Sequence, residues 1–67
     1  MMQIVLNGKQ REVPGDVTAA RLIDMLDLAG KRLALEVNGE MVLRSTFGEH
    51  RLRDGDRVEI VRAVGGG

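Results

Sequence analysis

Residues 2–13 read MQIVLNGKQREV, and this stretch decides the fold. Every second side chain of residues 2–6 is large and apolar, which is typical of one buried face of a β-strand. Asn7 and Gly8 follow at once and supply the two positive φ angles of a type I′ hairpin turn. Residues 9–13 are therefore expected to return antiparallel, and their mostly polar side chains suit an edge strand that faces water.

A single helix is predicted after this hairpin. Pro14 and Gly15 end the second strand, because proline cannot donate a hydrogen bond to the ladder. Thr18 is the expected N-cap residue, and Asp16 is the other candidate. Gly30 is expected to end the helix, because glycine tolerates the left-handed conformation. The helix should have about three turns, and its apolar stripe has the spacing i, i+3, i+4 and i+7: Ala19, Leu22, Ile23 and Leu26.

Three further strands are predicted in the second half of the chain. Residues 33–37 alternate in polarity and end at Asn38-Gly39, a second type I′ signal. The segments that follow are a short returning strand at 41–43, a loop or 3₁₀ segment at 45–51 anchored by Phe47 and Leu52, a turn at Asp54-Gly55-Asp56 and a last strand at 58–61. On that last strand, Val58 and Ile60 should point inward and Val61 outward.

This order of elements requires the helix to cover one face of one sheet. The most economical solution is an α+β fold of the β-grasp, or ubiquitin-like, type, in which one mixed sheet packs on one main helix. We assign residues 1–64 to this domain and residues 65–67 to a flexible C-terminal glycine tail. The order alone does not fix which strands pair.

Composition excludes several classes of function. A chain of 67 residues has no room for two lobes around a catalytic cleft. Ten basic and ten acidic residues, with one aromatic, argue against binding to nucleic acid or to an anionic membrane. No apolar run is long enough to span a bilayer, and the N-terminus lacks the features of a signal peptide. The absence of cysteine excludes disulfides and thiolate chemistry and fits a cytoplasmic location.

No catalytic, cofactor-binding or metal-binding side chains are predicted. His50, the single histidine, is interpreted as a solvent-facing loop residue. Asp54-Gly55-Asp56 is interpreted as a tight turn, because the rest of a calcium loop is missing. Neither glycine-rich phosphate-binding fingerprint is present. The chain is therefore expected not to be an enzyme.

The three glycines at positions 65–67 allow a different kind of chemistry. A tail without Cβ atoms can present the α-carboxylate of Gly67 inside a narrow channel of another enzyme. Joining that carboxylate to AMP creates a good leaving group, which a sulfur donor could replace to form a thiocarboxylate. This scheme needs no reactive side chain on the chain itself. The alternative is that the glycines are a frayed or added end.

Five segments resemble, in order and spacing, the ThiS family of ubiquitin-like sulfur carriers of thiamin biosynthesis. They are QIVLNG at 3–8, TAARLIDML at 18–26, LEVNG at 35–39, MVLRS at 41–45 and DGDRVEI at 54–60. With the glycine ending they cover nearly the whole chain. Leu43 departs from the family pattern, which often has proline at that position, and the local turn is the feature that this departure affects.

The resemblance implies a β-grasp fold and a set of partners. A ThiF-like, E1-like adenylyltransferase would adenylate the terminal carboxylate with ATP and magnesium, so that the chain itself binds no cofactor. A cysteine desulfurase or another persulfide donor would supply sulfur, and a ThiG-like thiazole synthase would receive it. On the family pattern, Gly67 carries the sulfur, Gly66 completes the glycine pair and Gly65 extends it by one residue.

Two valines near the tail, Val61 and Val64, are candidate contacts for a partner enzyme. Other functions remain open at this point. The chain could be a sulfur carrier for molybdopterin synthesis or for another pathway, a ubiquitin-like modifier conjugated to lysines, or a β-grasp interaction or RNA-binding domain with an incidental glycine tail. The neutral charge and the single aromatic residue count against RNA binding.

Overall fold

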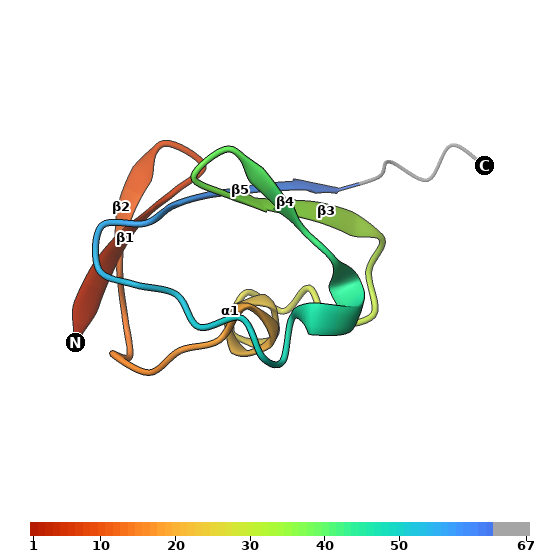
Figure 1. Cartoon of the computed structure of the whole chain (residues 1–67), viewed down its shortest axis with the longest axis horizontal. Helices are drawn as coiled ribbons and strands as arrows, with labels where there is room; N and C mark the ends of the chain where they lie inside the picture. The colour runs from red at the N-terminus through yellow and green to blue at the C-terminus, as the bar shows by residue number, and fades with distance from the viewer. Residues whose placement is uncertain (63–67) are drawn as a thin grey trace.

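The computed structural model describes residues 1–62 as one five-stranded sheet with one α-helix against one face (Figure 1). The elements are β1 (Met2–Leu6), β2 (Lys9–Val13), α1 (Ala19–Met25), β3 (Leu33–Val37), β4 (Glu40–Val42), the 3₁₀ helix η1 (Arg44–Thr46) and β5 (Arg57–Arg62). Every predicted strand is present. The predictions for Val64, for the glycine tail 65–67 and for the boundary before residue 65 lie outside the described residues.

The strands lie in the order β2-β1-β5-β3-β4, so the last strand in the chain occupies the centre of the sheet. β1 and β5 are parallel, whereas the other three neighbouring pairs are antiparallel. The predicted mixed sheet is therefore confirmed. The polar strand β2 lies at one edge, as predicted, and the three-residue strand β4 lies at the other.

Both Asn-Gly pairs form the predicted hairpin turns. Asn7 and Gly8 have φ angles of 48° and 83°, and Asn38 and Gly39 have φ angles of 53° and 86°. Positive φ at both central positions defines the type I′ turn, whose twist matches that of the flanking strands. The turns set the registers Leu6 opposite Lys9 and Val37 opposite Glu40.

The helix begins where predicted but ends earlier. Thr18 is the N-cap residue, and its hydroxyl oxygen accepts a hydrogen bond from the Arg21 amide at 3.2 Å. The helix ends at Met25, so the expected length of about three turns and the expected stop at Gly30 are wrong. Asp27 takes the left-handed conformation instead, with φ of 60°.

Hydrogen bonds at this helix end explain the early stop. The Leu28 amide donates to the carbonyl of Ile23, and the Asp27 amide donates to the carbonyl of Asp24, both at 3.0 Å. This pair of bonds is the Schellman motif, which satisfies carbonyls that the helix leaves free. Aspartate is among the few residues other than glycine that adopt the left-handed conformation readily.

The segment between β4 and β5 caps the N-terminal end of α1 by accepting hydrogen bonds from its first amides. The amides of Ala19 and Ala20 donate to the carbonyls of His50 and Phe47, at 2.9 and 3.0 Å. These are first-turn amides that a helix cannot satisfy internally. Phe47 and Leu52 are buried, which confirms them as anchors. Leu43 has a φ of −70°, close to the fixed angle of proline, so the turn into η1 forms without that residue.

The core lies between the helix and the inner face of the sheet. Its three largest fully buried side chains are Ile4 on β1, Leu22 on α1 and Leu35 on β3. On β5, Val58 and Ile60 are buried whereas Glu59 and Val61 are exposed, as the alternation predicted. Among residues 1–62, no helix has the length and apolar character needed to cross a bilayer.

Candidate functional site

β5 is the element that leads to residues 63–67, and it is held on both sides. On one side β3 pairs with it as far as Leu33 opposite Arg62. On the other side β1 pairs with it only through Val5 opposite Arg57 and Leu6 opposite Val58. The backbone of β5 is therefore fixed up to its last residue on one side, while β1 stops four residues earlier.

The side chain of Asn7 forms hydrogen bonds with β5 beyond the point where β1 ends. Its Oδ1 accepts a hydrogen bond from the Ile60 amide at 2.8 Å, and its Nδ2 donates to the Ile60 carbonyl at 3.3 Å. One turn residue thus replaces a neighbouring peptide unit in the ladder. This contact fixes β5 two residues before it ends.

Asn38, the matching residue of the second turn, holds the other end of β5. Its Oδ1 accepts from the Arg57 amide at 2.9 Å, and its Nδ2 donates to Oδ1 of Asp56 at 3.0 Å. Both Asn-Gly turns therefore contact the central strand as well as joining their own hairpins. The Asn-Gly motif predicts the turn from the sequence, but it does not predict this second contact with β5.

We expect Asn7→Ala to lower the free energy of unfolding by about 2–3 kcal/mol. Two hydrogen bonds to Ile60 are lost, each with a net contribution of about 1 kcal/mol, and alanine is unfavourable at positive φ. Asn7→Gly is the matched variant, because glycine accepts the φ of 48° but lacks the side-chain bonds. Its loss should be smaller, because glycine loses only the two hydrogen bonds and avoids the unfavourable φ. Urea denaturation measures both values, and equal losses would contradict this division of the two effects.

Val61 lies on the outer face of the sheet, which is the face turned away from α1. It is 64% exposed and lies opposite Ala34 of β3, which is also exposed. The predicted outward orientation is therefore confirmed, while its role as a partner contact stays a prediction. The next residue pair along this face, Glu36 opposite Glu59, places two acidic residues across from each other.

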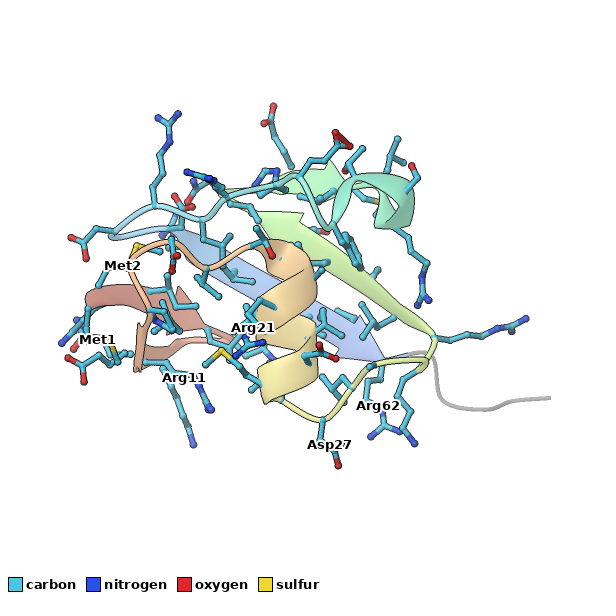
Figure 2. All side chains as sticks on the ribbon, turned by 90° about the horizontal axis from the view of Figure 1, so that it is seen from below. Met1, Met2, Arg11, Arg21, Asp27 and Arg62 are labelled. Atoms are coloured by element: carbon cyan, nitrogen blue, oxygen red, sulfur yellow. The ribbon has the colours of Figure 1, made fainter. Side chains whose placement is uncertain are left out.

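A shallow hollow adjoins Val61 and is bordered by basic side chains. Its lining includes Lys31, Arg32, Leu33, Ala34, Arg44 and Val61. Arg62 belongs to the same end, since it lies opposite Leu33 in the sheet, and Figure 2 shows it at the end remote from Met1 and Met2. We call the four exposed side chains of Lys31, Arg32, Arg44 and Arg62 the basic end.

Other candidate residues form structure rather than a reactive centre. The carboxylates of Asp54 and Asp56 accept hydrogen bonds from the amides of Gln3 and Arg53, both at 2.8 Å, which confirms the predicted turn. His50 is half-buried rather than fully solvent-facing, because its segment packs on the start of α1. Within residues 1–62, no group of histidine and acidic residues is arranged to hold a metal ion.

Comparison with known proteins identifies the family. A family model described as "ThiS family" matches residues 4–67. The chain belongs to the ThiS family. A crystal structure of a thiamine biosynthesis protein (ThiS) from Geobacter metallireducens has a TM-score of 0.84 and 32% identity, and the alignment covers 98% of this chain and 100% of the other. This structural likeness confirms the β-grasp fold.

Two curated relatives differ in how much of them this ThiS-family chain covers. The sulfur carrier protein ThiS of Escherichia coli is 29% identical over 66 residues, which are 98% of this chain and 100% of the relative. A thiazole synthase of Paramagnetospirillum magneticum is 35% identical over 66 residues, but these are only 20% of that protein. The chain thus spans about a fifth of the length of the thiazole synthase that it matches.

Sequence patterns did not predict the basic end of this ThiS-family member. Its four residues come from the loop before β3, from η1 and from the end of β5, and only Lys31 and Arg32 are adjacent in the chain. Net charge carries no signal, because equal numbers of acidic residues cancel the basic ones over the whole molecule. The pairing of Leu33 with Arg62 and the hydrogen bond from Arg44 to the Lys31 carbonyl bring these segments together.

Proposed function

We propose that the chain is a sulfur carrier of thiamin biosynthesis and that the carboxylate of Gly67 is the group that carries the sulfur. The observation that supports this proposal best is the family match, because it extends to residue 67 and so includes the glycine ending. The E. coli sulfur carrier, whose whole length aligns with this chain, supports it further. In this role the chain is a substrate of its partner enzymes and is not itself an enzyme.

The proposed chemistry proceeds in three balanced steps. A carboxylate oxygen of Gly67 attacks the α-phosphate of ATP on a ThiF-like adenylyltransferase, which holds the magnesium, and pyrophosphate leaves. A persulfide sulfur, supplied by a cysteine desulfurase or related donor, then displaces AMP at the acyl carbon. A thiol reduces the resulting acyl disulfide, which leaves the thiocarboxylate on Gly67 and a disulfide on the donor.

A ThiG-like thiazole synthase is the proposed acceptor of the sulfur. The relative from Paramagnetospirillum magneticum supports this pairing, because a segment similar to the whole chain forms part of a protein named thiazole synthase. A carrier and an acceptor encoded in one polypeptide have a high effective concentration for each other. The separate chain would meet the same kind of acceptor by diffusion.

Intact mass spectrometry tests the proposed function. The chain is incubated with a ThiF-like enzyme, ATP, magnesium, a persulfide donor and a thiol, with E. coli ThiS as the positive control. We expect an adduct with the mass of AMP, followed by a product in which one oxygen is replaced by sulfur. Fragmentation should place the change at Gly67. No mass change, under conditions that convert the control, would contradict the proposal, and conjugates on lysines would favour a modifier instead.

A further inference from the structure

The described residues have an uneven distribution of charge although the chain is neutral. Four of the ten basic residues form the basic end, and none of the ten acidic residues lines the hollow that it borders. Two acidic residues also lie at this end, since Asp24 lines the neighbouring pocket with Arg44 and Figure 2 shows Asp27 at the same end as Arg62. The rest of the molecule carries six basic and eight acidic residues. This separation gives the domain a positive end, and that end is the one at which β5 finishes.

The basic end is built on a fixed framework. A guanidinium nitrogen of Arg44, Nη2, donates a hydrogen bond to the backbone carbonyl of Lys31, and this bond ties η1 to the loop before β3. Val61 and Ala34 lie opposite each other and add a small exposed apolar surface beside the charged side chains. Protein interfaces commonly combine an apolar centre with a polar rim whose charges complement those of the partner.

The charge pattern also has a direction along the sheet. Two residues further along the strands from Val61 and Ala34, Glu36 and Glu59 lie opposite each other on the same outer face. Like charges directly opposite in a sheet are destabilising. An acidic partner surface would thus be attracted at the basic end and repelled over the middle of the sheet, which restricts the orientations in which it can approach.

The length of chain beyond β5 places the partner close to this end. Five residues, 63–67, follow Arg62. A fully extended chain of that length spans roughly 17 Å. An enzyme that reacts with the carboxylate of Gly67 must therefore approach within that distance of Arg62, where it meets the basic end and Val61.

We propose that the basic end, together with Val61 and Ala34, docks on an acidic rim around the active-site entrance of thiazole synthase. The proposal rests on the sulfur-carrier function proposed above. Thiazole synthase is the partner to which the comparisons point, since a similar segment forms part of such an enzyme. The positive charges would accelerate encounter and set the orientation, while Val61 and Ala34 would supply the apolar contact.

A charge-reversal experiment tests the docking surface. The double variant Arg32→Glu/Arg62→Glu is compared with Lys9→Glu/Arg11→Glu, which makes the same change in net charge on exposed residues of β2. All chains carry a chemically prepared thiocarboxylate, so that activation is not required. Thiazole formation by the synthase of the same organism gives KM and kcat, calorimetry gives Kd at several salt concentrations, and thermal unfolding verifies the fold of each variant.

We expect the first double variant to raise Kd and KM about tenfold, with kcat nearly unchanged. The wild-type Kd should rise with salt, and that of the variant should depend on salt much less. The β2 variant should stay close to wild type. Equal effects of both variants, or no effect of either, would overturn the docking proposal. A wild-type thiocarboxylate that supports no thiazole formation would instead overturn the proposed function.

Discussion

Deletion of Gly66 and Gly67 is expected to abolish thiocarboxylate formation while the free energy of unfolding stays the same. The deletion leaves three residues after Arg62 instead of five and shortens the maximum reach of the carboxylate by roughly 7 Å. It also places the new carboxylate on Gly65. The last buried core residue of the described chain is Ile60, and we expect the deletion to leave that core intact.

Deletion of Gly65 alone is the matched control for this experiment. It keeps the Gly66-Gly67 pair and shortens the reach by only about 3.5 Å, so conversion should continue at a reduced or equal rate. Mass spectrometry after incubation with the activating enzyme measures conversion, and urea denaturation measures stability. Full conversion of the chain that lacks Gly66 and Gly67 would contradict the role proposed for the glycine ending.

Leu22→Ala is expected to have the largest effect on stability, with a loss of about 2–5 kcal/mol. Leu22 is 0% exposed and lies between the helix and the sheet. Alanine would remove buried methyl groups and leave a cavity that the surrounding side chains fill only in part. A domain of this size has a total stability of about 3–10 kcal/mol, so the variant should lose a large share of it.

Leu26→Ala provides the comparison at constant side-chain chemistry. Leu26 is the C-cap residue and packs against the core while only partly buried. Its truncation should therefore cost clearly less than that of Leu22. Urea midpoints, analysed with a shared m-value, give both losses. Equal losses would show that the two ends of the apolar stripe are packed alike, against the burial described here.

The local elements could be predicted because their signals lie within a few residues of each other. The Asn-Gly pairs determine turn type and register, and Thr18 marks the start of the helix. The end of the helix could not be placed in the same way. Asp27 and Gly30 can both adopt positive φ, and the structure shows that they both do. The carbonyls of Ile23 and Asp24 select the earlier position.

The features around the candidate site depend on contacts between distant parts of the chain. Asn7 meets Ile60 across 53 positions, and Arg44 meets Lys31 across 13. Periodicity and turn chemistry carry no information about such pairs. The outward orientation of Val61 could be predicted because it follows from alternation within one strand, whereas the clustering of basic side chains around it required the order of the strands.

The central place of β5 also constrains how the chain acquires its structure. The β1–β2 and β3–β4 hairpins occupy opposite sides of the sheet, and β5 is the strand that pairs with both. A nascent chain that has not yet released residues 57–62 from the ribosome holds two hairpins and a helix without the strand that unites them. Contacts of such long sequence separation form slowly. Completion of the fold must therefore wait until the ribosome has released the segment that directly precedes the three glycines.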